Sequence, residues 1–185
     1  MILDNFDLLC DRFPEVSGHA YLVYVQRRRK DGNLDLEAMS ELFFGIHGFV
    51  LVDYFLVKDG ADLMARKEQI TQACETNNAR AYLCPHAKNL AHIGIRAKEI
   101  YEEGQREGDE EKMRYAHFIA CLQEKDVAQM RLLIDVDDEW GYDPQEISLY
   151  LYRKTQEEPI YVPTINGCHL ICKPIPKDQI RGKYH

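Results

Sequence analysis

The amino-acid sequence predicts an α/β (α+β) protein in which a mixed β-sheet is layered with helices, with a closing C-terminal β-hairpin. Three observations lead to this fold class. Segments rich in aromatic and β-branched residues alternate with segments whose apolar residues recur at helical spacing. Asp143-Pro144 is a strong helix start, because Asp caps a helix well and Pro fits its first turn. Asn166-Gly167 lies between two β-rich segments, and this dipeptide is the strongest short-range hairpin signal.

The first half of the chain is predicted to contain three strands and three helices. The strands cover residues 20–26, 49–57 and 79–84. The second strand is nearly all apolar, which is typical of a central strand, and Pro85 is expected to end the third. The helices are predicted over residues 35–45, 61–75 and 88–103, and a turn at residues 31–33 precedes the first of them.

The second half of the chain continues the alternation. A solvated loop is predicted at residues 104–109. Helices are then predicted over residues 110–124 and 143–157, and strands over residues 130–136, 160–163 and 168–173. The last two strands form the hairpin, which adds an antiparallel element to an otherwise alternating order. The sheet is therefore expected to be mixed.

The size and charge of the chain bound its function. The length of 185 residues suits a single domain, residues 1–185, which buries about 70% of its unfolded surface and needs no disulfide or metal for its core. The formal net charge of -8 argues against a protein that coats nucleic acid. A nucleic-acid enzyme needs only a local basic track, such as Arg27-Arg28-Arg29-Lys30. The alternative for this segment is a solvated turn.

The sequence predicts a cytoplasmic protein with no membrane partner. Its first residues are acidic, unlike the basic start of a secretory signal. It contains no run of about 18 apolar residues that would span a membrane. The six cysteines include no C-x-x-C pair, so they are expected to be reduced core thiols.

The most informative segment is the acidic cluster Asp135-Val136-Asp137-Asp138-Glu139, which follows an apolar strand. Side chains alternate along a strand, so Asp135 and Asp137 share one face. Neighbouring carboxylates repel each other, and a divalent cation with oxygen ligands relieves this repulsion. Mg²⁺ or Mn²⁺ suits such ligands, and two such ions can catalyse phosphoryl transfer. The alternative is a strand that ends in water with exposed acidic side chains.

A second candidate site lies just before the last predicted strand. The hydroxyl of Thr164, the backbone N–H of Gly167 and the imidazole of His169 together would make a phosphate-binding corner. The alternative is a structural hairpin whose histidine is satisfied in the core.

These two segments in this order resemble the archaeo-eukaryotic primase superfamily, which includes the primase-polymerases. The resemblance rests on a strand that ends h-h-D-h-D, where h is apolar, and on a later G-x-H that leads into a strand; it covers about residues 130–175. It implies that Asp135 and Asp137 bind catalytic Mg²⁺ or Mn²⁺, and that His169 binds the phosphates or sugar of a nucleoside triphosphate. The family's third motif is a further Asp at a strand end. The sole Asp after His169 is Asp178, in a Pro- and Lys-rich context.

The resemblance implies a metal-dependent nucleotidyltransferase that acts on nucleic acid, or a degenerate relative. Thr164, Asn166 and Gly167 would join His169 in binding the nucleotide. Asp138 and Glu139 would be reserve metal ligands. The side chains that would hold nucleic acid are Arg27, Arg28, Arg29, Lys30, Arg80 and Lys88. Two other functions stay open: a catalytically silent nucleic-acid-binding module of the same fold, and a protein-interaction module with His169 in its core.

Overall fold

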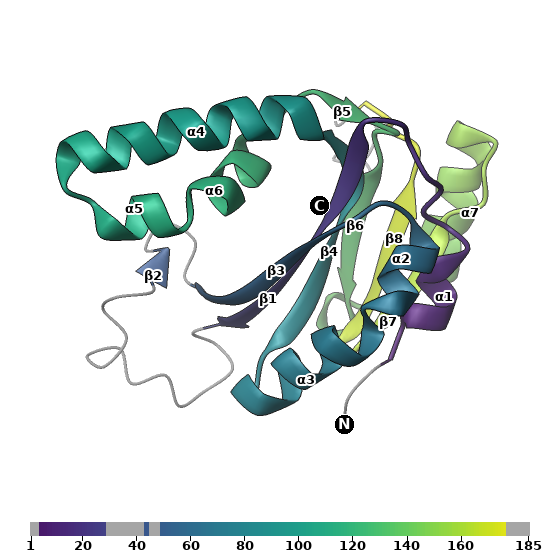
Figure 1. Ribbon diagram of the computed structural model, residues 1–185. Helices are drawn as coiled ribbons and strands as arrows, with labels where there is room; N and C mark the ends of the chain where they lie inside the picture. The colour runs from purple at the N-terminus through teal and green to yellow at the C-terminus, as the bar shows by residue number, and fades with distance from the viewer. Residues whose placement is uncertain (1–3, 29–42, 45–48, 177–185) are drawn as a thin grey trace.

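The computed structural model describes residues 4–28, 43–44 and 49–176 and shows an α+β protein with two sheets (Figure 1). The predicted fold class and the closing hairpin are confirmed. The sheets differ from the single mixed sheet that was expected. One has five strands and the other three, and every strand pair in the described ranges is antiparallel.

The five-stranded sheet, called the large sheet below, forms the middle of the molecule. In spatial order its strands are β2 (Phe43–Phe44), β3 (Phe49–Val57), β1 (His19–Arg28), β4 (Arg80–Asn89) and β5 (Val127–Ala128). The central strand is β1, whereas the sequence favoured β3. On its outer side β3 has only the two residues of β2 as a partner in the described ranges. Its apolar character reflects the helices that cover both faces of the sheet.

Helices cover the large sheet on both faces (Figure 1). On one face lie α4 (Leu90–Glu107), α5 (Glu110–Arg114) and α6 (Ala116–Gln123), and on the other lie α1 (Phe6–Cys10), α2 (Gly60–Ala65) and α3 (Lys67–Asn77). Alternate residues of β1 point into the two cores: Leu22 packs with Ile93 and Phe118, whereas Tyr21 packs with Ile70.

Several predicted helix boundaries were wrong. The helix expected at residues 61–75 is interrupted at Arg66, and the helix expected at residues 110–124 is interrupted at Tyr115. Helix α4 runs through most of the expected loop and ends at Glu107, and Gly108 caps it with a φ of 69° that suits glycine. The turn predicted at residues 31–33 and most of the helix predicted at 35–45 lie outside the described residues, and Phe43–Phe44 form a strand instead of that helix's end.

Pro85 lies inside β4 instead of ending it. Leu83 of β4 faces Val23 of β1, and Ala87 faces Tyr21, so three residues of β4 oppose one residue of β1. Pro85 is the middle residue of these three. A bulge tolerates proline because the extra residues leave the regular hydrogen-bond ladder.

The three-stranded sheet, called the small sheet below, carries the predicted site residues. Its strands are β6 (Leu132–Asp137), β8 (Gly167–Cys172) and β7 (Ile160–Thr164), in that order. A 3₁₀ turn (Asp138–Trp140) follows β6 and leads to α7 (Pro144–Thr155), which is capped by Asp143 as predicted. Ile147 and Leu151 of α7 pack on one face of the small sheet.

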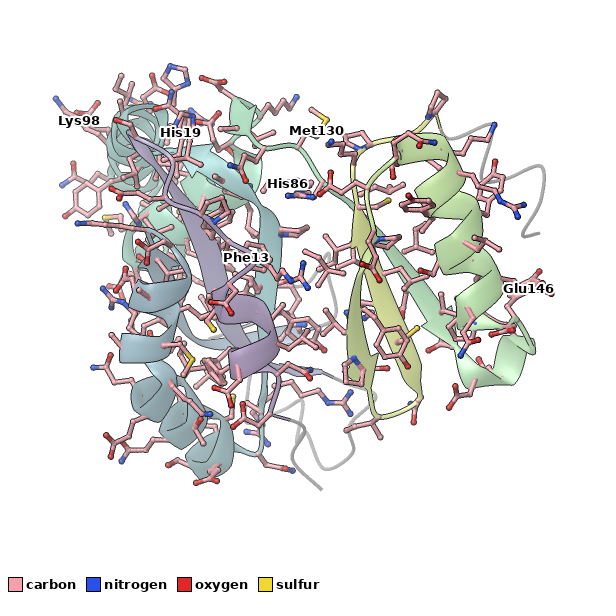
Figure 2. The ribbon with its side chains drawn as sticks, turned by 90° about the vertical axis from the view of Figure 1, so that its right-hand side faces the viewer. Phe13, His19, His86, Lys98, Met130 and Glu146 are labelled. Carbon is pink, nitrogen blue, oxygen red and sulfur yellow. The ribbon has the colours of Figure 1, made fainter. Side chains whose placement is uncertain are left out.

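The two sheets are joined at several points. The Asn5 side chain donates to the Pro163 carbonyl at 3.0 Å, and the Arg131 backbone N–H donates to His86 Nδ1 at 3.0 Å. Leu9 of α1 packs against three buried residues of the small sheet, Ile160, Val162 and Ile171. Figure 2 shows the small sheet between α7 and the large sheet, with His86 pointing toward it.

The cysteines are unpaired, and three of the six lie in the core where all six were predicted. All six are free thiols, of which Cys121, Cys168 and Cys172 are buried and the others half-buried. Within the described ranges, none of the helices has the length and apolar character that crossing a membrane requires.

Candidate functional site

Asp135 and His169 lie side by side on neighbouring strands. Asp135 of β6 is directly opposite His169 of β8 in the antiparallel register. The distance between the carboxylate Oδ1 and the imidazole Nε2 is 3.3 Å. The Asp135 side chain is 54% exposed and that of His169 is 28% exposed. His169 is therefore not a core residue, and the pair is accessible from solvent.

Asp137 lies two residues further along the same face of β6, opposite Gly167. Gly167 has a φ of 147°, and a Cβ atom at this position would collide with the carbonyl oxygen of Val136. Glycine thus allows β8 to approach β6 closely. The glycine of the G-x-H motif therefore has a structural reason of its own: it permits the strand spacing that brings His169 to Asp135.

The turn between β7 and β8 is tied to the end of β6. The Asp138 backbone N–H donates to the Asn166 carbonyl at 2.8 Å. Thr164 ends β7 opposite Gly167 and is half-buried, whereas Asn166, Asp138 and Glu139 are exposed. Gly167 and His169 therefore lie directly opposite the two predicted metal ligands, whereas Thr164 lies one strand further away, on β7.

One face of the small sheet is free of α7. Because α7 packs on the face that contains Val136 and Leu170, the carboxylates and His169 occupy the opposite face. Leu9 covers the part of that face formed by β7 and β8. The β6 side stays open, since Leu133 is 38% exposed and Asp135 more so. A ligand would therefore approach along β6.

The donor set suits a metal that keeps water and substrate ligands. Mg²⁺ is commonly bound through one or two carboxylates, with waters and substrate phosphates completing its octahedron. Asp135 and Asp137 can supply those carboxylates from one strand face. In the part of the chain that the structure describes, no group of three or more His, Cys, Asp or Glu side chains is arranged to hold a metal.

Cys168 lies beside the site residues in sequence but serves the core. Burial raises the pKa of its thiol; the Tyr161 hydroxyl, hydrogen-bonded to it, lowers this pKa, and the negative charges of Asp138 and Asp135 raise it. The net shift is upward, so the thiol stays protonated at neutral pH. Cys168 is therefore a packing residue and not a nucleophile.

The predicted basic residues whose side chains the structure describes lie on the large sheet, whereas Asp135 lies on the small sheet. Arg27 and Arg80 are half-buried on β1 and β4 of the large sheet. The prediction that Lys88 contacts nucleic acid is not supported, because Lys88 is only 5% exposed. The strand β4 continues past Pro85, so Lys88 lies within the sheet, between Ala20 and Val127, instead of in an exposed helix. Arg28 belongs to β1, and Arg29, Lys30 and Asp178 lie outside the described residues.

A cationic pair that the sequence did not single out lies at the other end of the small sheet. Arg131 precedes β6 and Lys173 follows β8. Both contact Glu157: the Arg131 guanidinium is 2.6 Å from its Oε1, and the Lys173 ammonium is 2.9 Å from its Oε2. These hydrogen bonds lower the pKa of Glu157. Residues 131 and 173 lie at the ends of predicted strands, but their meeting depends on the pairing of β6 with β8, and the place of Glu157 depends on the connection from α7 to β7.

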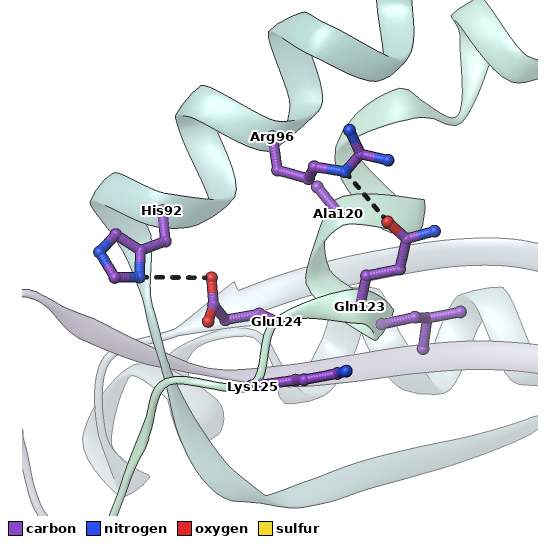
Figure 3. A pocket seen from close by; sticks show the side chains of 7 residues that line it. His92, Arg96, Ala120, Gln123, Glu124 and Lys125 are labelled. Carbon is purple, nitrogen blue, oxygen red and sulfur yellow. Dashed lines mark hydrogen bonds and ion pairs between the residues drawn. The ribbon is translucent and has the colours of Figure 1, made fainter.

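A shallow groove of about 580 Å³ lies elsewhere, between α4 and the end of α6 (Figure 3). Its polar side chains mostly bind one another: His92 Nδ1 is 3.8 Å from the Glu124 carboxylate, and the Arg96 Nε donates to Gln123 at 3.2 Å. The polar side chains of the groove are therefore less available to a ligand than the carboxylates of β6.

The chain matches no protein-family model, no curated protein and no solved structure.

Proposed function

We propose that this chain is a metal-dependent nucleotidyltransferase of primase-polymerase type, or a degenerate relative, that acts on nucleic acid. The observation that carries the proposal is the accessible pair of Asp135 and His169, 3.3 Å apart, with Asp137 on the same strand face. Carboxylates bind Mg²⁺ or Mn²⁺, and an imidazole N–H can donate to a phosphate oxygen. The cytoplasm is the proposed compartment, because free thiols such as the six of this chain stay reduced there.

Each site residue has a distinct role in the proposed reaction. A divalent metal bound here would neutralise phosphate charge and lower the pKa of an attacking hydroxyl. Asp135 and Asp137 would supply its carboxylate ligands. His169 would donate from Nε2 to a phosphate oxygen of the nucleoside triphosphate. The Thr164 hydroxyl and the Asn166 amide would border the nucleotide at the end of the sheet.

The contact between Asp135 and His169 also supports a second candidate function. Through this contact the carboxylate can hold the imidazole in place without any metal. A module that binds nucleic acid and performs no chemistry would use the pair in this way. The two functions differ in whether a metal competes with His169 for Asp135.

Titration calorimetry with Mn²⁺ tests the proposal. We expect the wild type to bind Mn²⁺, and to bind it more tightly when a non-hydrolysable nucleoside triphosphate is present, since its phosphates complete the coordination. The double variant Asp135→Ala/Asp137→Ala should lose at least tenfold in Mn²⁺ affinity. A wild type that binds no Mn²⁺ in either condition would overturn the catalytic proposal and leave the binding module.

A charge-matched control separates the site from a general effect of net charge. Glu99 and Glu102 lie on α4 with side chains 54% and 51% exposed. Glu99→Ala/Glu102→Ala removes the same two negative charges, and we expect it to bind Mn²⁺ as the wild type does. Equal losses in the two double variants would show that Mn²⁺ binds by general attraction to an acidic protein. If only the site variant loses binding, primer extension with Mn²⁺ then tests the reaction itself.

A further inference from the structure

We infer that the outer edge of β6 binds a further β-strand, supplied by a partner protein whose extended segment alternates basic and apolar side chains. The inference goes beyond the proposed function, because it concerns the backbone of β6 and requires neither metal nor nucleotide. Three observations carry it: the direction of the backbone groups of β6, the closed state of the other edge of the same sheet, and the charges along β6.

In the described part of the chain β6 is an edge strand, since the small sheet has the order β6-β8-β7 and β6 pairs only with β8. The Asp138 N–H donates to the Asn166 carbonyl at 2.8 Å, so these opposite residues form a hydrogen-bonded pair. Hydrogen-bonded and non-hydrogen-bonded pairs alternate along antiparallel strands, so Val136 and Ile134 also bond to β8. The residues between these point their N–H and C=O groups away from β8: Leu133, Asp135 and Asp137.

The opposite edge of the small sheet, on β7, is closed. Pro163 has no N–H, and proline on an edge strand prevents pairing with another strand. The Pro163 carbonyl accepts a hydrogen bond from the Asn5 side chain at 3.0 Å, and Leu9 of α1 covers buried residues of the same strand. The strand β6 contains no proline, and its Leu133 is 38% exposed. Of the two edges, β6 is therefore the one that can accept a further strand.

The side chains of β6 define the strand that fits beside it. Asp135 and Asp137 lie on the face away from α7, and the Asp135 side chain is 54% exposed. Opposite charges on neighbouring strands stabilise a sheet, so a lysine or arginine beside each carboxylate suits this face. On the other face Ile134 packs in the cluster under α7, and an apolar side chain beside it extends that core. Because side chains alternate between faces, the fitting segment alternates basic and apolar residues.

A second copy of this chain fits the edge less well. An antiparallel pairing of two β6 strands centred on Asp135 sets this carboxylate opposite its own counterpart, and one centred on Val136 sets it opposite Asp137. Like charges directly opposite each other are destabilising. A pairing centred on Ile134 leaves Asp135 opposite the apolar Leu133. The net charge of -8 adds repulsion between copies in every register. A basic partner avoids these costs, and the backbone hydrogen bonds of strand addition supply its affinity.

Binding of a basic strand peptide tests the inference. The probe is a fluorescein-labelled peptide Val-Lys-Val-Lys-Val-Lys-Val, followed by fluorescence anisotropy in metal-free buffer, and we expect the wild type to bind it. The same peptide with every backbone nitrogen methylated keeps the side chains and the charge but has no N–H to donate. It should bind about a hundredfold more weakly, because several backbone hydrogen bonds are lost. Equal binding of the two peptides, or no binding of the unmethylated peptide, contradicts the inference.

Two substitutions of Leu133 locate the bound peptide. Leu133→Pro removes an N–H that points away from β8 and leaves the bonds to β8, so it should weaken binding about five- to tenfold. Leu133→Lys keeps the backbone and sets a positive charge against the peptide, and it should weaken binding about three- to fivefold. Leu149→Lys is the matched control: it makes the same change on α7, where Leu149 is 50% exposed, and should bind the peptide as the wild type does. Equal losses for Leu133→Lys and Leu149→Lys would mean general attraction of a basic peptide to an acidic protein, and the inference would fail.

Light scattering after size-exclusion chromatography tests the competing occupant, a second copy of the chain. We expect Leu133→Lys to leave the mass of the protein in solution unchanged, because the edge of β6 is not used between copies. A wild-type dimer that Leu133→Lys dissociates would show that a second copy occupies the edge, and would overturn the proposal of a basic partner.

Discussion

Gly167 has no side chain, and this allows β8 to lie close to β6. With a φ of 147° and the Val136 carbonyl in the way of any Cβ, Gly167→Ala would strain the backbone and push β8 from β6. We expect it to lower the free energy of unfolding by about 1–3 kcal/mol in urea denaturation. Because Asp137 and His169 are set by this strand pairing, Mn²⁺ affinity should fall as well.

Gly94 offers the opposite case within the same chain. It is exposed in α4, and a Cβ there would meet nothing within 4 Å. Alanine is favoured over glycine in a helix by about 0.8–1.0 kcal/mol, so Gly94→Ala should stabilise the protein. If Gly94→Ala and Gly167→Ala destabilised the protein equally, the argument from close strand approach at Gly167 would fail.

The positions of single site residues could be predicted where they depend only on the alternation of side chains along a strand. Asp135 and Asp137 share a face because they are two apart on a strand, and the sequence indicated that strand. Lys88 was misjudged, because the prediction ended its strand at Pro85 and could not show the bulge that admits proline. Arg131 and Lys173 were missed as a pair, because their meeting depends on which strands are neighbours.

Among the elements, α7 is the one whose start the sequence indicated best, and it supports the site from behind. The Asp143 side chain accepts a hydrogen bond from the Gln145 backbone N–H at 2.8 Å. Asp143→Ala should therefore cost about 1 kcal/mol of unfolding free energy in urea denaturation, with a range of about 0.5–2. Asp143→Asn keeps an oxygen acceptor and should stay close to the wild type. A loss as large for Asn as for Ala would point to charge instead of capping.

Elements were predicted well where local chemistry sets them and poorly where packing does. The strand β3 follows from its composition, and the hairpin of β7 and β8 from the Asn-Gly signal, although its two loop residues are Ile165 and Asn166 and Gly167 begins β8. The interruptions at Arg66 and Tyr115 carry no Gly or Pro, so the sequence gives no local signal for them. The division into two antiparallel sheets depends on long-range pairing, which the order of strands and helices alone leaves open.

At the scale of the whole molecule, His86 is a titratable group at the contact between the large and small sheets. Its Nδ1 accepts the Arg131 backbone N–H, which requires an unprotonated nitrogen there. Burial lowers the pKa of His86, and the nearby Lys88 ammonium lowers it further. Below pH 6.5 the His86 imidazole therefore binds a proton more readily in the unfolded chain than in the folded protein. This contribution to stability is complete above pH 6.5 and is lost as the pH falls toward the lower pKa of the folded state.

Urea unfolding at pH 7.5 and pH 5.5 measures this effect. Between pH 7.5 and pH 5.5, the free energy of unfolding of the wild type should fall by up to about 1 kcal/mol more than that of His86→Ala. The difference stays small because His86 is only half-buried and solvent screens its charge. All other titratable groups are present in both proteins, so their contributions to the pH dependence cancel in this comparison. If the two losses are equal, His86 does not couple pH to the contact between the sheets. If the wild type loses more, mild acid loosens the start of β6, and with it the Arg131 end of the face that carries Asp135.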